Sequence, residues 1–132
     1  RVIAIKPTTF MNLSGEAVNA VQRFYRIYNQ STIVVYDELA VPFGSLRTRV
    51  GGTDAGHNGV KSLIQHIGDD FGRLRIGIGS DLAEKSDSAE YVLKKFNKLE
   101  SDSLGLITKE ACAMITEYLV NGELPHDTRN LI

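Results

Sequence analysis

Three polar clusters of the sequence contain the residue types that acid–base chemistry and hydrogen-bond recognition use. Asn12 precedes a predicted helix, Asp37 follows an apolar run, and His57 and Asn58 lie in a glycine-rich stretch. Amide side chains supply neutral hydrogen-bond donors, whereas an imidazole oriented by a carboxylate can take up a proton. Each residue also has a plain structural interpretation, Asn12 and His57 as loop residues, Asp37 as a turn residue and Asn58 as a helix cap. Both interpretations stay open for each residue taken alone.

The glycine-rich stretch from Gly51 to Gly59 opens a predicted helix, so its backbone N–H groups could face a phosphate. It lacks the Gly-Lys-Ser/Thr ending of a P-loop, and its glycine spacing is not that of a dinucleotide-binding fingerprint. Nucleotide hydrolysis is therefore disfavoured. A loop shaped for the close approach of a larger substrate remains open.

Apolar periodicity predicts strands that alternate with helices along the chain. The expected strands are residues 2–5, stopped by Pro7, then 33–36, buried on both faces, and the alternating runs 46–50 and 73–79. Four helices are expected: one after Ser14 as its N-cap, one over 60–67 that ends before Gly68, a short one through 92–96, and a long one from about Ser101 to Asn121. The polar stretch from Asp81 to Ser88 is expected to be a connection. Because the step from Tyr36 to Leu46 is too short for a crossover helix, we expect a three-layer α/β/α domain around a twisted mixed sheet.

The 132 residues, 42% hydrophobic and 23% charged, predict one domain with one core. No apolar run approaches the roughly 18 residues of a membrane span, and no secretory leader opens the chain, so a cytoplasmic protein is expected. Cys112 is the single cysteine, which excludes an internal disulfide, and we expect it to fill core space in a helix. We expect neither a metal site, because cysteines and histidines do not cluster, nor a cofactor.

Four motifs occur in one order along the chain: Lys-Pro-Thr-Thr-Phe-Met-Asn-Leu-Ser-Gly at 6–15, Asp-Glu-Leu at 37–39, Gly-His-Asn-Gly at 56–59 and Arg-Leu-Arg-Ile-Gly-Ile-Gly at 73–79. Their order and spacing resemble bacterial peptidyl-tRNA hydrolase, and the similarity extends over essentially the whole chain to a Thr-Arg-Asn-Leu tail. The resemblance implies an α/β enzyme that hydrolyses the ester bond between peptide and tRNA and so recycles tRNA. A monomer is the default expectation for its oligomeric state. Peptidyl-tRNA is the implied partner, and no membrane is.

The resemblance also implies roles for individual residues. Asn12 and Asn58 look like the two asparagines that hold the peptide and the 3′-terminal nucleotide region near the scissile ester. Asp37 looks like the carboxylate that orients a general-base histidine. Such a site activates a water, polarises the carbonyl and stabilises the oxyanion without a metal. Further residues expected to bind the substrate are Phe10, Met11 and His57.

The general-base histidine is the difficulty in this assignment. In the resembling family it lies in a segment that precedes the strand expected at 2–5, and nothing here matches that segment. The chain starts at Arg1, without methionine, directly in an apolar run. We therefore expect that an N-terminal segment is lacking and that the chain as given has little hydrolase activity. His57 belongs to a different motif, and His66 and His126 are expected on a helix and in the tail.

Other functions of the same fold compete with the enzyme. A non-catalytic RNA-binding or adaptor module is the main alternative, and a nucleotide-binding α/β module is weaker because no phosphate motif is present. Since the formal net charge is −1, any RNA binding must come from a local patch. Arg47, Arg49, Arg73 and Arg75, with Lys61 near the glycine loop, form such a patch. Each alone could be a solvated or ion-paired side chain, but together they favour a track of contacts to tRNA phosphates.

Overall fold

The computed structural model describes residues 1–80 and 87–132 and contains two compact units. The first unit, Arg1–Thr32 with Gly51–Phe71, contains the 3-10 helices η1 (Met11–Leu13) and η2 (Asn29–Ser31) and the helices α1 (Ser14–Tyr25) and α2 (Asn58–Ile67). The second unit, Ile33–Val50 with Gly72–Ile132, contains strands β1 (Ile33–Pro42), β2 (Ser45–Val50), β3 (Gly72–Gly79) and β4 (Asp127–Asn130) and helices α4 (Ser88–Leu93) and α5 (Lys98–Asn121). Most of the connection expected from Asp81 to Ser88 lies outside the described residues, and the single domain expected over 1–132 stays a prediction.

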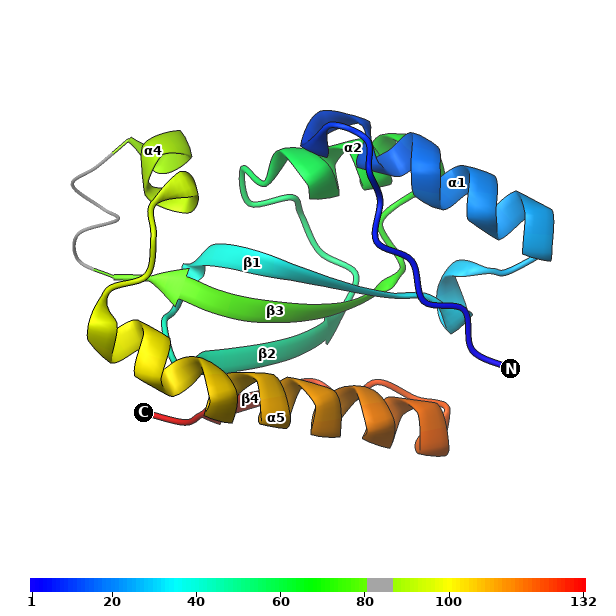
Figure 1. Ribbon diagram of the computed structural model, residues 1–132. Coiled ribbons are helices and arrows are strands. Elements are labelled where there is room, and N and C mark those ends of the chain that lie inside the picture. The colour runs from blue at the N-terminus through cyan, green and yellow to red at the C-terminus, as the bar shows by residue number, and fades with distance from the viewer. Residues whose placement is uncertain (81–86) are drawn as a thin grey trace. The chain divides into compact units, whose positions relative to one another are not determined.

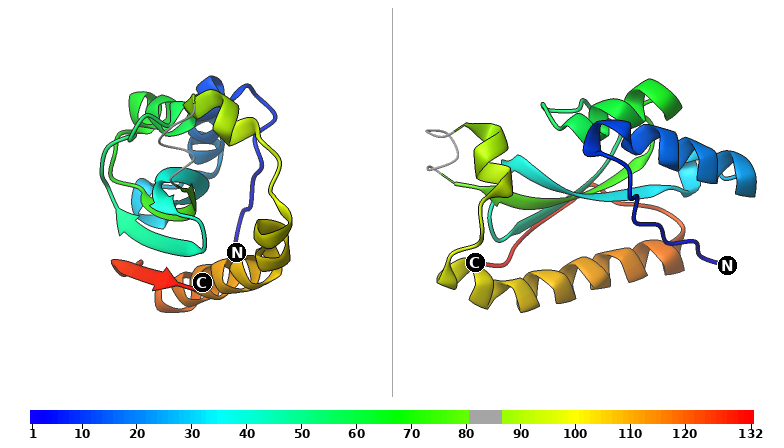
Figure 2. Two further views of the ribbon diagram at one scale, coloured as in Figure 1. Left: turned by 90° about the vertical axis from the view of Figure 1, so that its left-hand side faces the viewer. Right: turned by 45° about the horizontal axis from the view of Figure 1, so that its top comes forward.

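The strands of the second unit form one mixed sheet in the order β1-β3-β2-β4 (Figure 1). β1 pairs parallel with β3, whereas β2 runs antiparallel to both β3 and β4. A tight turn links β1 to β2 without a helix, and its Gly44 has a φ of 92°, which glycine adopts at low cost. The strands twist relative to one another (Figure 2). The α/β fold class with a twisted mixed sheet is confirmed.

Helix α5 covers one face of this sheet (Figure 1). Its Ile107, Ala111 and Met114 pack with Leu46 of β2 and Leu74 of β3, and all five side chains are buried. Alternation along each strand directs Leu46 and Leu74 to the same face. Burial of one large side chain of this kind contributes about 1.5–3 kcal/mol, so this cluster is the main apolar support of the second unit.

Helix α5 begins at Lys98, earlier than predicted, because a capping box precedes it. Asn97 Oδ1 accepts a hydrogen bond from the backbone N–H of Glu100 (2.8 Å), and Glu100 Oε1 accepts one from the backbone N–H of Asn97 (2.9 Å). The helix ends as predicted, at Gly122, which has a φ of 76°.

Two predictions about apolar helix faces are wrong. Cys112 is exposed and does not fill the core, because the packing face includes Ala111 and the next residue lies about 100° round the helix. Helical spacing after Ser14 predicts an apolar stripe through Phe24 and Tyr28, but Phe24 of α1 is 80% exposed, and Tyr28, which lies beyond the end of α1, is 76% exposed. The residue of α1 that is buried is Gly15, so a small residue and not an aromatic one makes the close helix contact.

Strand β1 differs from its prediction in length and position. It lies at an edge of the described sheet, so its Val35 is 44% exposed, although a strand buried on both faces was expected. The strand also continues past the predicted end at Tyr36, which places Asp37 opposite Ile76 within the ladder. Apolar β-branched runs occur in edge strands as well as central ones, and the pattern alone does not separate the two.

The strand predicted at residues 2–5 does not form. The segment before η1 has no strand partner among the described residues, and Val2 and Ile5 are 65% and 45% exposed. An apolar run becomes a strand only where another backbone completes its hydrogen bonds. The prediction of a strand at residues 2–5 is therefore wrong.

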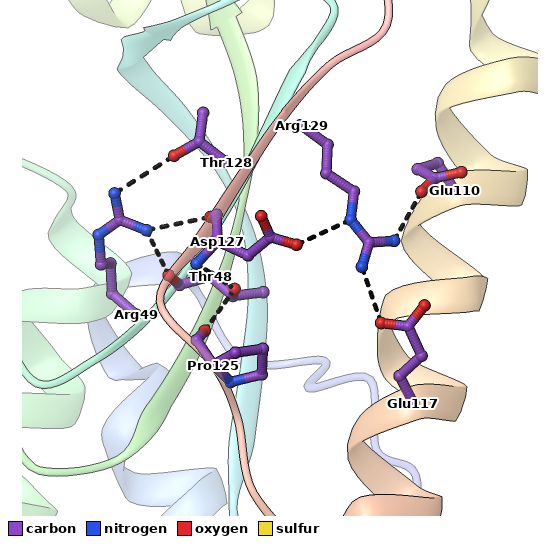
Figure 3. Close-up of polar contacts among 8 residues, drawn as sticks. All are labelled: Thr48, Arg49, Glu110, Glu117, Pro125, Asp127, Thr128 and Arg129. Atoms are coloured by element: carbon purple, nitrogen blue, oxygen red, sulfur yellow. Dashed lines mark hydrogen bonds and ion pairs between the residues drawn. The ribbon is translucent and has the colours of Figure 1, made fainter.

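Strand β4 has no counterpart among the predicted strands, since its residues Asp-Thr-Arg-Asn are polar. It pairs with β2, and Thr48 of β2 accepts a hydrogen bond from the Asp127 backbone N–H (3.2 Å) (Figure 3). Arg49 of β2 donates to the Asp127 carbonyl (3.0 Å) and to Thr128 Oγ1 (3.2 Å). Backbone pairing and these side-chain bonds, not apolar alternation, hold β4 in the sheet.

Arg129 of β4 binds three carboxylates, and the two on α5 join the strand to that helix (Figure 3). Its guanidinium lies 2.6 Å from Glu110, 2.7 Å from Glu117 and 2.9 Å from Asp127. The hydrogen bonds with Glu117, Glu110 and Asp127 hold the pKa of Arg129 above its usual value. The Arg129 side chain is 24% exposed, so these pairs are partly shielded from water, unlike ordinary surface ion pairs.

Candidate functional site

Asn12 is the middle residue of η1, a single helical turn that leads directly into α1. Phe10 precedes η1, and the Ser14 hydroxyl donates to the Met11 carbonyl (2.7 Å), which closes the turn. Ser14 was predicted as the N-cap of α1, but it is the first residue of that helix. A fixed turn therefore holds Asn12, where a loop was predicted.

His57 caps helix α2, although Asn58 was considered for that role. The His57 Nδ1 atom accepts hydrogen bonds from the backbone N–H groups of Gly59 (3.1 Å) and Val60 (3.2 Å). A nitrogen that accepts two hydrogen bonds carries no proton, so these contacts require the tautomer with hydrogen on Nε2. Asn58 is then the first residue of the helix, and its amide is not needed for capping.

Two glycines bring η1 and α1 close to α2. A Cβ atom at Gly59 would lie 2.6 Å from Met11 Sδ, and one at Gly15 would lie 2.2 Å from the Ser62 carbonyl oxygen. The Gly15 backbone N–H also donates to Ser62 Oγ (2.9 Å). The contact at Gly15 is with backbone and leaves no space for a side chain, whereas the flexible Met11 side chain could move away from a larger residue at Gly59. The turn that carries Asn12 thus packs against the first turns of α2.

A pocket of about 380 Å³ lies at this junction, within the first unit. Asn12 lines it from η1, and the remaining lining residues, from one side of α2, are Asn58, Lys61, Ser62 and Gln65. Neither Asn12 nor Asn58 uses its side-chain amide in a hydrogen bond among the described residues. Both amides are therefore available to a ligand, while Lys61 supplies the single formal charge of the lining.

The other predicted substrate-binding residues lie next to this pocket in sequence. Phe10 is 81% exposed and Met11 57% exposed, so each offers apolar surface beside Asn12.

Asp37 is half-buried on β1, in the second unit, and its neighbour Glu38 is buried. From the places of these residues at loop ends, we predict that Asp37 lines one pocket with Asn12 and Asn58.

The four arginines of the predicted patch lie on one face of the sheet. Arg47 pairs with Arg75 and Arg49 with Arg73 across β2 and β3, on the face opposite Leu46 and Leu74. Alternation along residues 73–79 places Arg73 on an outward face and would predict an exposed side chain, but Arg73 is 0% exposed. An alternating pattern predicts which face a side chain occupies but not whether that face is covered.

The remaining arginines are partly exposed, and two of them have partners in the sheet. Arg75 donates to the Tyr36 hydroxyl (2.9 Å), and Arg49 holds β4 as described above. The Nε atom of Arg47 is buried without a hydrogen bond from the described residues. The side chain of Arg47 forms no hydrogen bond or ion pair with the described residues, so its guanidinium is less committed to the fold than those of Arg49 and Arg75. Lys61 belongs to helix α2 and the pocket, and not to this sheet face.

All three histidines of the chain lie in the described part, and each has a contact. His57 caps α2, His66 Nδ1 lies 2.8 Å from the Ser62 carbonyl oxygen, and His126 Nε2 accepts from the Val50 backbone N–H (3.3 Å). Among residues 1–80 and 87–132, no group of three or more histidine, cysteine or acidic side chains could hold a metal ion. Within the same residues, no helix has the length and apolar character needed to cross a bilayer.

Sequence reasoning missed Gly15, Gly59, Ser62 and Gln65. The first two matter because of what packs against them, which no local pattern reveals. For Ser62 and Gln65 a signal existed, since both lie one and two turns from Asn58 on the same side of the predicted helix.

Comparison with known proteins agrees with the motifs. A family model described as peptidyl-tRNA hydrolase matches residues 1–130. Relatives named peptidyl-tRNA hydrolase include those of Aliarcobacter butzleri, 47% identical over 79% of this chain, Gloeobacter violaceus, 44% identical over 92%, and Sorangium cellulosum, 40% identical over 98%. The chain spans 56%, 62% and 60% of the lengths of these relatives, respectively.

Solved structures of the same kind have a similar fold. A crystal structure of a peptidyl-tRNA hydrolase complexed with n-propanol matches with a TM-score of 0.75 and 35% identity, over 90% of this chain and 60% of that one. The peptidyl-tRNA hydrolase of Acinetobacter baumannii matches with a TM-score of 0.71 and 32% identity, over 88% of this chain and 61% of that one. The chain belongs to the peptidyl-tRNA hydrolase family.

Proposed function

We propose that this chain binds and helps to hydrolyse the ester bond between a peptide and tRNA, and so recycles tRNA from stalled or released peptidyl-tRNA. The observation that carries the proposal is the pocket in which Asn12 and Asn58 present uncommitted amides, in a chain that belongs to this family. An amide N–H can donate to the ester carbonyl and to the oxyanion that develops on it. We further propose that Phe10 and Met11 contact the peptide and that the protein acts as a cytoplasmic monomer.

Hydrolysis also needs a base that activates water. We propose that Asp37 orients that base, a histidine, by fixing its tautomer and stabilising the imidazolium that forms. The contacts of His57 argue that it is not this base, because its Nδ1 accepts two hydrogen bonds and the ring proton is then on Nε2. His66 and His126 lie in none of the four motifs that carry the family resemblance. We therefore infer that the 132-residue chain alone hydrolyses its substrate about 10²- to 10⁴-fold more slowly than a protein that contains the base, because a general base usually contributes a factor of that size.

The test compares hydrolysis of N-acetylated aminoacyl-tRNA by the 132-residue chain and by a version extended upstream in frame with its gene. We expect the extended protein to turn over substrate about 10²- to 10⁴-fold faster than the 132-residue chain, and to lose most of that rate in Asn58→Ala and in Asp37→Asn. Asn121→Ala, at the exposed end of α5, is the matched control and should keep full activity.

Two results would change the proposal. Equal turnover by the short and extended proteins would refute the inference about the base and direct attention to His57. If the extended protein bound tRNA without hydrolysing it, the chain would instead be the non-catalytic RNA-binding or adaptor module that its fold also permits.

A further inference from the structure

Lys61 is the charged residue of the pocket, and its position is set by helix geometry. It lies three residues after Asn58 and four before Gln65, so the three side chains follow one side of α2, with neighbouring Cβ atoms about 5–6 Å apart. Among residues 1–80 and 87–132, no carboxylate forms an ion pair with Lys61. The pocket therefore combines neutral amides with one uncompensated positive charge.

A phosphate is the first ligand to consider for such a lysine, but the surroundings fit it poorly. Phosphate sites at helix N-termini use the free backbone N–H groups of the first turn. Here the N–H groups of Gly59 and Val60 are both taken by His57 Nδ1. A phosphate beside Lys61 would thus meet a single mobile point charge, without the converging donors that usually complete an anion site.

We propose that Lys61 is a specificity-determining residue that disfavours substrates with a free α-ammonium group next to the ester. The inference rests on the proposed function, because it places the scissile carbonyl at the Asn12 and Asn58 amides. The α-nitrogen lies about 2.5 Å from that carbonyl carbon, so it enters the same pocket. In peptidyl-tRNA this nitrogen is a neutral amide, whereas in aminoacyl-tRNA it is a cation that Lys61 repels.

The expected size of the effect follows from Coulomb repulsion between two unit charges. At a separation of about 8 Å and an effective dielectric constant between about 20 and 80, the repulsion corresponds to roughly 2- to 30-fold in affinity. Lys61 is exposed, so the lower part of this range applies at physiological salt and the upper part at low salt.

Binding is the primary test, because it does not depend on catalysis. The probes are two 3′-aminoacylamino adenosines, in which a stable amide replaces the ester, one with a free and one with an acetylated α-amine. For the 132-residue chain we expect the acetylated probe to bind roughly 2- to 30-fold more tightly at pH 6. Lys61→Gln should bring the ratio of the two affinities close to one, Lys61→Glu should reverse the preference, and Lys61→Arg should keep it. Lys109→Gln, on the exposed side of α5, is the control and should change nothing.

The pH dependence supplies a second signature. Because an α-amine loses its proton near pH 8, the preference of the parent chain should decline between about pH 7 and 9, and Lys61→Gln should show no such decline. If Lys61→Gln weakened both probes by one factor and left their ratio unchanged, the proposal would be overturned in favour of a simple binding role. Equal binding of both probes to the parent chain would overturn it as well. The proposed function is judged separately, by whether the extended protein hydrolyses N-acetylated aminoacyl-tRNA at all.

Discussion

Gly15→Ala should destabilise the first unit, because α1 and α2 touch at this residue without space for a methyl group. The new Cβ would lie 2.2 Å from the Ser62 carbonyl oxygen and 2.6 Å from His66 Nδ1, whereas ordinary contact needs 3.4 Å or more. The helices must therefore separate, which also breaks the 2.9 Å hydrogen bond from Gly15 to Ser62 Oγ. Overpacking costs about 1–3 kcal/mol and the lost hydrogen bond about 1 kcal/mol, against a gain of up to about 1 kcal/mol in helix propensity.

The net expectation is a loss of about 1–3 kcal/mol in the free energy of unfolding, measured by urea denaturation followed by circular dichroism. Gly105→Ala is a matched control, since Gly105 is also helical but a Cβ there would meet nothing within 4 Å. That control should gain about 0.5–1 kcal/mol, because alanine is the better helix former. The two substitutions are chemically identical, so their opposite signs isolate the close contact.

One outcome would refute this reasoning. If Gly15→Ala were as stable as the parent while Gly105→Ala gained stability as expected, α1 and α2 could not be packed as closely as described. A further consequence concerns the pocket: separation of α1 from α2 also moves η1, so Gly15→Ala should weaken binding of the acetylated adenosine probe even where most of the protein is folded.

Three other predictions follow from side-chain contacts. Arg129→Gln should lower the free energy of unfolding by about 1–3 kcal/mol, more at low than at high salt, because it leaves three carboxylates without their shared cation; an equal effect at both salt concentrations would contradict the ion-pair account. His57→Ala should cost about 1 kcal/mol through loss of the α2 cap, whereas His57→Asn, which can also cap, should restore most of it; if His57→Asn were no more stable than His57→Ala, capping would not be the role of this side chain. Gln substitutions of Arg47 and Arg75 should each reduce the slope of log K for tRNA against log salt by roughly 0.7–0.9, and Lys substitutions should preserve it; an unchanged slope in the Gln double variant would rule out phosphate contacts there.

Periodicity predicted the fold class because alternation and helical spacing record which side chains a core buries. The alternating runs 46–50 and 73–79 and the helix predicted from about Ser101 supply the core residues Leu46, Leu74 and Ile107, and the short β1–β2 link excluded an all-parallel sheet. The failures have a common cause, since they concern what lies beyond the element itself. Whether Val35 is covered, whether Arg73 reaches solvent and whether Val2 finds a strand partner depend on segments distant in sequence.

The candidate site was predicted from motif resemblance more than from residue chemistry. An asparagine in a loop carries no physical mark of function, and Asn12 and Asn58 are separated by an entire helix in the sequence. Their convergence depends on Gly15 and Gly59, whose importance appears only when the packing partners Ser62 and Met11 are known. His57 was even harder to assign, because a histidine that caps a helix and one that binds a substrate can occupy the same motif.

The pairing of β4 with β2 has a consequence for the order in which the second unit is made. Asp127 follows Thr48 by 79 residues. At about 5–20 residues per second, a ribosome therefore needs roughly 4 to 16 s after completing β2 to synthesise β4, the strand that pairs with the free edge of β2. Throughout that interval the nascent sheet exposes unpaired backbone groups along β2, and Arg129 has not yet reached its three carboxylates. The growing chain is thus open to pairing with other polypeptides along β2 until β4 emerges.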